Sequence, residues 1–191
     1  MTDTGALVRA ARKSRRLTQV ELAERVRSDQ ASVSRAERGR DAEFATIARL
    51  LGGAGHRLYS APTRRDDAAA VAAEIRRRLA GGDKERALRA LIQLNDDLIA
   101  EQGLVRGVLG LAEPETTGDR VWDAALAALV AWRLTEEGLP TPDWVEAESR
   151  QLPDARVLDV DPADPVPPPS EVPEQFLRRG VLAWRQTFES V

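Results

Sequence analysis

Side chains suited to reading DNA bases are concentrated in one short segment near the N-terminus. Gln30 carries an amide that can form two hydrogen bonds with adenine, and Arg35 carries a guanidinium that can do the same with guanine. Between them, Ser32 and Ser34 are short enough to let a helix approach the bases closely. These contacts require one helix that presents the four side chains on its outer face, so the surrounding sequence must supply that helix.

Two short helices are predicted around this segment. Thr18 is a candidate N-cap, and Glu21, three residues later, completes a capping box for the first helix. Asp29 is the candidate N-cap of the second helix, in which Val33 faces inward. A further helix, from about Ala42 to Leu51, has apolar residues at spacings of three and four and is expected to close a small core.

These residues resemble the lambda-repressor and Cro-like helix-turn-helix family, also called the xenobiotic-response-element family. The resemblance covers roughly residues 5–55 and is carried by Leu-Thr-Gln-x-Glu-Leu-Ala at 17–23 and Gln-x-Ser-x-Ser-Arg-x-Glu-x-Gly at 30–39. It implies that the second helix lies in the major groove with its N-terminal residues at the base edges. The residues expected at the bases are Gln30, Ala31, Ser32, Ser34 and Arg35.

The resemblance also implies contacts with the DNA backbone. Gln19 would contact a phosphate, because it lies at the N-terminus of the first motif helix, where exposed backbone N–H groups point at an anion. Arginines on either side of the motif are further candidates, since phosphate contacts position a protein on DNA without reading its sequence. These candidates are Arg12, Arg16, Arg38 and Arg40.

The segment 56–61 predicts a means of dimerisation. Its side chains alternate after two glycines, a pattern typical of a short strand. Because a lone strand is unstable, its expected partner is the same strand of a second copy, which would give the two-fold homodimer that a palindromic operator requires. The alternative is an irregular linker.

Charge and proline content divide the chain in two. Residues 1–60 carry 12 Arg or Lys against 7 Asp or Glu, whereas residues 61–191 carry 16 against 24. None of the 11 prolines precedes Pro62. We therefore expect a DNA-binding domain at 1–60, a linker at 61–67 and a helical partner-binding domain at 68–191. This division of charge is typical of a domain that binds a polyanion, such as DNA, joined to a second domain that must not bind the same polyanion.

The second half is expected to be helical with one extended segment. An apolar helix ends at Gly81-Gly82, and Asp83 caps the helix that follows. Another helix is predicted at about 118–137, and a short one within 172–180. Residues 161–169 are too rich in proline for a helix or an inner strand. The expected fold class is mainly α, with a helix-turn-helix bundle, one short dimerising strand, and a helical C-terminal domain.

Two pieces of the second half, 87–97 and 173–184, resemble the C-terminal part of actinobacterial helix-turn-helix proteins that often neighbour nucleotidyltransferase-type toxins. The resemblance implies an antitoxin whose acidic half masks a toxin while its basic half represses the shared operon. Trp144, Phe176 and Trp184 are the expected contacts with that protein, unless they close the chain's own core. The remaining alternative is a ligand-sensing regulator without a toxin partner.

Composition argues against an enzyme. The chain has no Cys and one His, His56, so no thiolate, His-rich metal site or His-based relay is expected, and no cofactor-binding motif is found. The longest apolar run, Ala124–Trp132, is far shorter than the roughly 20 residues that cross a bilayer. We therefore expect no membrane partner and a cytoplasmic protein, associated with the nucleoid when it is bound to DNA.

Overall fold

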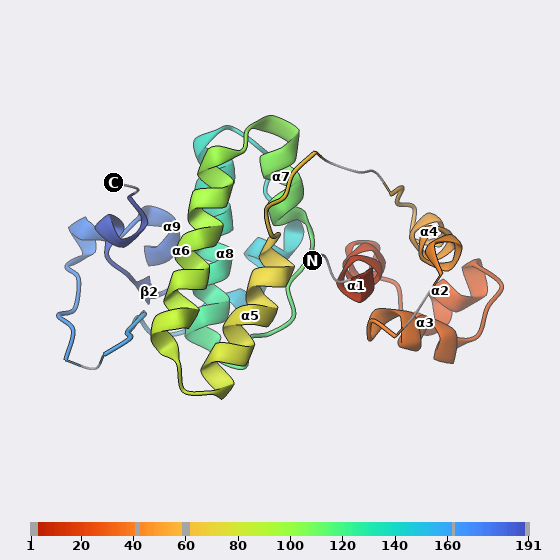
Figure 1. Cartoon of the computed structure of the whole chain (residues 1–191), viewed down its shortest axis with the longest axis horizontal. Coiled ribbons are helices and arrows are strands. Elements are labelled where there is room, and N and C mark those ends of the chain that lie inside the picture. The colour runs from red at the N-terminus through yellow and green to blue at the C-terminus, as the bar shows by residue number, and fades with distance from the viewer. Residues whose placement is uncertain (1–3, 41–42, 59–61, 162, 190–191) are drawn as a thin grey trace. The chain divides into compact units, whose positions relative to one another are not determined.

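A computed structural model describes residues 4–40, 43–58, 62–161 and 163–189. The chain divides into two compact units, Met1–Thr63 and Arg64–Val191, which are described separately below (Figure 1). The predominance of helix in both units confirms the expected fold class.

The division between the units lies inside the segment 61–67 for which a linker was predicted. Part of that segment belongs to the second unit. Arg65 forms ion pairs with Asp97 and Glu101, and Asp67 accepts a hydrogen bond from the backbone N–H of Ala70 as the N-cap of the next helix. The linker is therefore shorter than the sequence predicted.

The described part of unit 1 is a bundle of four short helices (Figure 1). They are α1 (Thr4–Ser14), α2 (Gln19–Arg25), α3 (Gln30–Glu37) and α4 (Phe44–Gly53). One side chain or more from each helix enters a common core, including the fully buried Val8, Leu22 and Val33 and the nearly buried Ile47 and Leu50. This core fixes α3 against α1 and α2, and so determines which face of α3 stays outside.

The first residue to approach α3 from α1 is a glycine. A Cβ atom on Gly5 would lie 2.6 Å from the carbonyl oxygen of Glu37 and 2.8 Å from the backbone nitrogen of Gly39. No L side chain fits at that distance without a shift of backbone, so α1 and the C-terminal end of α3 meet backbone to backbone.

The predicted dimerising strand at 56–61 is not seen where the structure describes it. His56–Leu58 have no regular secondary structure, and residues 59–61 lie outside the described residues. His56 instead folds onto its own unit, with ring atom Nδ1 2.9 Å from the carbonyl oxygen of Ala54 and Nε2 3.3 Å from Ser14 Oγ.

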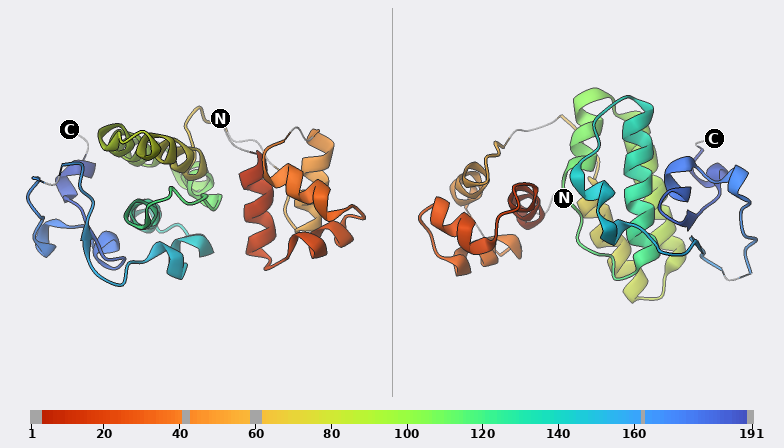
Figure 2. Two further views of the ribbon diagram at one scale, coloured as in Figure 1. Left: turned by 90° about the horizontal axis from the view of Figure 1, so that it is seen from below. Right: turned by 180° about the vertical axis from the view of Figure 1, so that it is seen from behind.

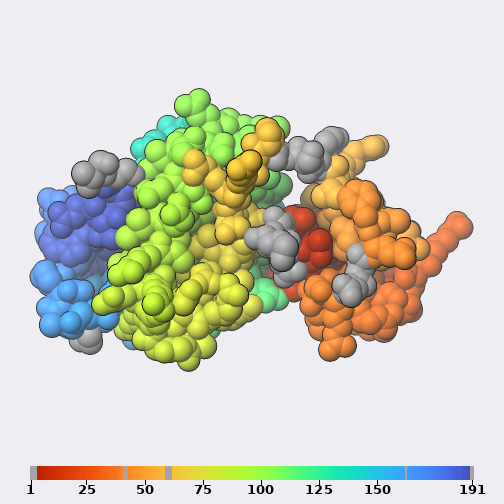
Figure 3. Space-filling view, viewed as in Figure 1, coloured from red at the N-terminus to blue at the C-terminus, as the bar shows by residue number. Residues whose placement is uncertain are grey.

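Unit 2 is built around one buried helix. Its longer helices are α5 (Ala68–Ala80), α6 (Lys84–Ala100), α7 (Gly103–Leu111) and α8 (Arg120–Glu136). All residues from Ala124 to Ala131 are buried, so α8 is apolar around its whole circumference, as expected for a helix in the middle of a core. α5 and α6 cover α8 on the face shown in Figure 3, and the other views show the C-terminal segments on its remaining sides (Figure 2).

The C-terminal segments consist of short pieces. They are η1 (Asp143–Glu146), η2 (Glu148–Arg150), β1 (Arg156–Val157), η3 (Pro169–Glu171), α9 (Glu174–Leu177), β2 (Val181–Leu182) and η4 (Arg185–Phe188). β1 and β2 form a parallel pair in which Arg156 is opposite Val181. Residues 163–168 contain no helix or strand, in agreement with the extended segment predicted from the prolines.

Two of the three aromatic residues predicted to contact a partner are buried, which corrects that prediction. Phe176 is completely buried against Trp132 and Phe188, with ring centroids 6.3 and 5.1 Å away. Trp144 is 6% exposed and donates its indole N–H to the carbonyl oxygen of Gly110. The alternative interpretation, that these side chains close the core of unit 2, holds for both. Trp184 is only partly buried, and its indole N–H donates to the Pro165 carbonyl oxygen.

Buried arginines join the C-terminal segments to the bundle. Arg133 on α8 donates to Asn95 Oδ1 at 2.8 Å and to the carbonyl oxygen of Phe188 at 2.9 Å. Asn95 donates to the same carbonyl, so η4 is attached to α6 and α8 at a single oxygen. Hydrogen bonds from a charged donor are about twice as strong as neutral ones, which suits them to holding a segment with little regular structure.

No described helix is long and apolar enough to cross a membrane.

Candidate nucleic-acid interface

The two motif helices begin where the sequence predicts. Thr18 Oγ1 accepts from the backbone N–H of Glu21, and Glu21 Oε2 accepts from the backbone N–H of Thr18 at 2.7 Å, which confirms the capping box. Asp29 Oδ1 accepts from the backbone N–H of Ser32 at 2.8 Å. These hydrogen bonds favour the ionised carboxylates, and they lower the pKa of both Glu21 and Asp29. Both N-termini are therefore fixed by local interactions.

The turn between α2 and α3 contains a residue in an unusual conformation. Arg27 has a φ of 53°, in the left-handed region, where an L side chain costs roughly 1–2 kcal/mol. The backbone N–H of the next residue, Ser28, donates to the carbonyl oxygen of Ala23 at 2.9 Å, so the turn closes over the end of α2. The strained residue thus permits the short connection that sets α3 across α2.

A buried carboxylate connects α3 to α1 and α2. Glu37, near the end of α3, is 3% exposed and receives two hydrogen bonds from Arg12 on α1, from Nε at 2.6 Å and from NH2 at 3.0 Å. The third guanidinium nitrogen of Arg12 donates to the carbonyl oxygen of Leu17 at 2.7 Å. Two-point pairing of this kind fixes both side chains in one geometry.

Two opposing effects act on the pKa of Glu37. Burial acts to raise its pKa, but the hydrogen bonds from Arg12 and Gln19, together with the positive charge of Arg12, outweigh burial and leave the pKa below its ordinary value. Glu37 is therefore held ionised, and the ion pair is a fixed part of unit 1.

The hydrogen-bond network continues from Glu37 to the outer face of α3. Gln19 donates its amide to Glu37 Oε2 at 2.8 Å and accepts at its own amide oxygen from Gln30 Nε2 at 2.7 Å. Gln30 itself is exposed. The predicted base-reading glutamine is thus oriented, through one intermediate side chain, by a buried ion pair.

The outer face of α3 contains most of the predicted base contacts. Gln30, Ala31 and Arg35 are exposed and Ser32 is partly exposed. Arg35 NH2 donates to Ser32 Oγ at 2.8 Å and lies 4.0 Å from a carboxylate oxygen of Asp29, so its guanidinium is held near the N-terminal end of α3.

Ser34 does not lie on this face, contrary to the sequence-based expectation. It is 7% exposed, and its hydroxyl accepts a hydrogen bond from Arg38 NH2 at 2.5 Å. Because a serine side chain is short, the neighbouring turn of α3 and the Arg38 side chain suffice to cover it. Ser34 therefore orients Arg38 rather than facing a ligand.

The candidates for phosphate contacts separate into two groups. Arg12 is only 13% exposed and all of its guanidinium nitrogens are used inside unit 1, so its predicted phosphate contact is wrong. Arg16, Arg38 and Arg40 are exposed, and Gln19 is partly exposed beside Gln30. These four remain available at the surface of unit 1.

Glu37 is the functional residue that sequence reasoning missed. It was part of the motif that carried the resemblance, but its partner Arg12 lies 25 residues earlier in the chain. The signal was an ionisable residue four positions after the inward-facing Val33, which places it on the same face of the helix, toward the core. Among the described residues, no group of His, Asp or Glu is arranged to hold a metal ion.

Comparison with known proteins agrees with this geometry. Residues 8–52 match the helix-turn-helix family, a match that extends from α1 to α4 and includes every contact in the network described above. No curated protein matches the chain, and no solved structure does. Residues 8–52 therefore match a helix-turn-helix domain of the lambda-repressor and Cro-like type, and this match supports a DNA-binding transcriptional regulator.

Proposed function

We propose that this protein is a sequence-specific repressor that inserts α3 into the major groove of an operator. The observation that carries the proposal is the connection from Gln30 through Gln19 to the buried Glu37–Arg12 pair. A side chain that is already oriented loses less conformational entropy when it binds. The network therefore favours one orientation of the Gln30 amide at the bases.

Each exposed residue of α3 has a proposed role at the bases. Gln30 pairs with adenine and Arg35 with guanine, while Ala31 and Ser32 allow close approach. Arg16, Arg38, Arg40 and Gln19 contact phosphates on either side. We propose no DNA contact for Arg12 or Ser34, because both side chains are used inside unit 1.

The test is a comparison of specific with non-specific binding. Gln30→Ala and Arg35→Ala should each weaken operator binding by about 1–3 kcal/mol and relax base preference at one position, because each removes one base contact. The operator is first selected from a pool of random duplexes with the unaltered protein. Arg49→Ala, on the exposed side of α4, removes the same charge away from α3 and is the matched control. If both α3 variants keep the original base preference, α3 is not the reading helix.

We further propose that two copies associate through α7. Leu104, Val108 and Leu111 recur at helical spacing and are 82%, 38% and 60% exposed. An exposed apolar stripe of this kind marks an interaction surface. Gly107 lies within it, and a Cβ atom there would have no heavy atom within 4 Å, so a second helix can approach closely.

The absence of charge on this stripe favours a second copy as its occupant. In a two-fold contact both copies use the same patch, so a patch with charges of one sign would meet charges of that sign on the partner. The one charged residue of α7, Arg106, is 8% exposed and donates to the carbonyl oxygens of Ile99, Glu101 and Arg133. The exposed face of α7 therefore brings no charge of its own into a self-contact.

The exposed apolar area predicts a weak dimer. Burying three partly exposed aliphatic side chains on each copy contributes about 7 kcal/mol in total, at roughly 1.5–3 kcal/mol for a fully exposed one. Association costs of about 4–15 kcal/mol are of similar size. Two half-sites on one duplex would strengthen the dimer, because they raise the effective concentration of one copy near the other.

Light scattering with and without a duplex that carries two half-sites tests this interface. Leu104→Glu should remain monomeric in both conditions, because each copy would then have to bury a carboxylate in an apolar contact. Leu177→Glu, at a 36% exposed leucine on α9, is the control and should behave like the unaltered protein. A Leu104→Glu protein that still pairs on the duplex would exclude α7 as the interface.

We also propose that unit 2 neutralises a protein toxin encoded by a neighbouring gene. The proposal is supported by the excess of acidic residues after residue 60, 24 against 16 basic ones, which suits a basic nucleotide-binding or RNA-binding cleft. Of the three predicted contacts only Trp184 keeps exposed surface, so it is the anchor that we retain.

Separate loss of the two activities would test this second role. When the protein is produced together with the neighbouring gene product, Trp184→Ala should lose protection from the toxin and keep repression of an operator-controlled reporter. Gln30→Ala should do the reverse. The antitoxin proposal is wrong if the neighbouring gene product is harmless alone, or if Trp184→Ala protects fully.

A further inference from the structure

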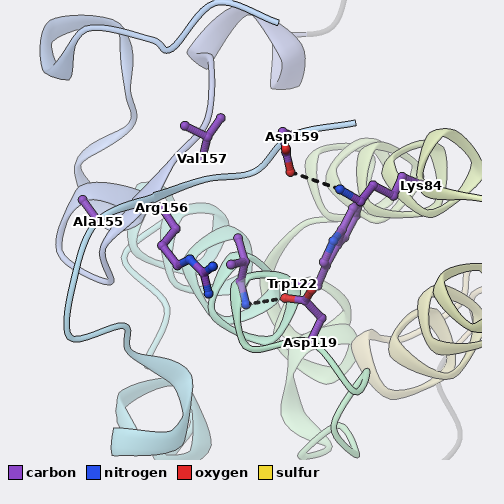
Figure 4. A pocket seen from close by; sticks show the side chains of 8 residues that line it. Lys84, Asp119, Trp122, Ala155, Arg156, Val157 and Asp159 are labelled. Atoms are coloured by element: carbon purple, nitrogen blue, oxygen red, sulfur yellow. Dashed lines mark hydrogen bonds and ion pairs between the residues drawn. The ribbon is translucent and has the colours of Figure 1, made fainter. Parts of the chain in front are cut away.

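Unit 2 contains a polar cavity that DNA binding does not use. Its volume is about 470 Å³, within the range of about 300–1,000 Å³ that is typical of small-molecule sites. Three segments line it, and they supply Lys84 at the start of α6, Asp119, Val121 and Trp122 at the start of α8, and Ala155, Arg156, Val157 and Asp159 around β1 (Figure 4).

The cavity is lined by an indole N–H group without an acceptor among the described residues. Trp122 is 2% exposed, yet no described residue accepts a hydrogen bond from its indole N–H, whereas the indoles of Trp144 and Trp184 both donate to carbonyl oxygens. A donor that lines a cavity and has no acceptor within the chain can donate to a ligand that enters the cavity.

The cavity also contains an arginine side chain without a partner among the described residues. Lys84 Nζ is 3.3 Å from Asp159 Oδ1, and Asp119 Oδ1 accepts from the backbone N–H of Val121, so these carboxylates have partners (Figure 4). The side chain of Arg156 extends from β1 toward α8 and forms no ion pair or hydrogen bond with any described residue (Figure 4). The N-termini of α6 and α8 add partial positive charge on the same side.

We propose that this cavity binds a small oxyanion, a carboxylate or a phosphate group, at the Arg156 guanidinium, with the Trp122 indole N–H lining the same cavity. A guanidinium matches both groups by forming two parallel hydrogen bonds, and the indole N–H is a further donor in the same cavity. The site is independent of the DNA-binding proposal, and it would give the regulator an effector.

The indole N–H signals in a ¹H–¹⁵N spectrum of the full chain provide a local test. The signal of Trp122 is identified by its loss in Trp122→Phe. Sodium phosphate and sodium acetate are added in separate titrations. We expect the Trp122 signal to shift until it saturates with at least one of the two anions, while those of Trp132, Trp144 and Trp184 stay in place. A response to phosphate alone, acetate alone, or both identifies the preferred oxyanion.

Two variants decide whether the shift reports this site. Arg156→Ala should raise the apparent Kd about tenfold or more, because a hydrogen bond to a charged group is lost. Arg89→Ala, an exposed arginine on α6 outside the cavity, should leave it unchanged. The proposal is overturned if the Trp122 signal is insensitive to both anions, or if it responds to them equally in Arg156→Ala.

Discussion

Replacing Glu37 by Gln should destabilise unit 1 by about 3 kcal/mol. The side chains of Glu37 and Arg12 are 4% and 13% exposed, so they form a nearly buried pair, and removal of one member of such a pair costs about 3–5 kcal/mol. The lower end applies because Arg12 keeps its hydrogen bond to Leu17. A unit of this size has a total stability of about 3–9 kcal/mol. The substitution therefore removes a large fraction of it.

Backbone amide exchange in the full chain measures this loss locally. In Glu37→Gln, amides of α1–α4 should exchange about 100-fold faster, while those of α8 in unit 2 keep their rates and serve as an internal reference. Glu24→Gln is the matched control, because Glu24 is exposed on α2 and its side chain has no partner among the described residues. Equal effects of the two substitutions would refute the role assigned to the Glu37–Arg12 pair.

Three further predictions concern stability. The depressed pKa of Glu37 stabilises unit 1 above the ordinary carboxyl pKa of 4.5, and this stability should be lost as pH falls below that value; acid titration followed by amide exchange should show a weaker dependence in Glu37→Gln. Arg27→Gly should stabilise unit 1 by up to about 1 kcal/mol in thermal unfolding, because glycine tolerates the positive φ, whereas Arg25→Gly within α2 should cost about 1 kcal/mol. Phe176→Ala should cost unit 2 about 3–5 kcal/mol in denaturant unfolding, and Leu177→Ala, at a 36% exposed position, markedly less.

The helix-turn-helix was predictable because its determinants are local. The capping box at Thr18 and Glu21 and the N-cap at Asp29 each involve residues three positions apart, and all were found as predicted. Such interactions depend on sequence spacing alone. The outward orientation of Gln30 and Arg35 follows from the helical period once Asp29 fixes where α3 begins.

Contacts that depend on packing between helices were not predictable in the same way. Arg12 was assigned to phosphate because its position on α1 is near the motif, but the fold brings it to Glu37, which neutralises it. Ser34 was assigned to the bases because the helical period alone does not show that the Arg38 side chain covers it. In both cases a charged side chain from another position determines the contacts: Glu37 pairs with Arg12, and Arg38 covers Ser34.

The sequence predicted the central helix of unit 2 well and missed α7. The expected range of 118–137 agrees with α8 at Arg120–Glu136. Its nine consecutive apolar residues favour a buried element over an exposed loop. α7 was missed because three of its nine residues are glycines, which normally indicate a break. In the structure a Cβ atom on Gly110 would lie 2.8 Å from Val130 Cγ1, so that glycine is needed for close packing of α7 on α8.

The buried aromatic residues restrict where unit 2 can bind a partner. α8 is apolar on every side, so α5, α6 and α7 alone cannot cover it, and the C-terminal segments must supply the rest of the core. Trp144 and Phe176 serve this purpose and are not available to a partner in the folded state. A partner of unit 2 must therefore use surfaces that this packing leaves open. Among the described residues these include the stripe on α7, Trp184 and the cavity beside Arg156, and each has a variant above that tests it.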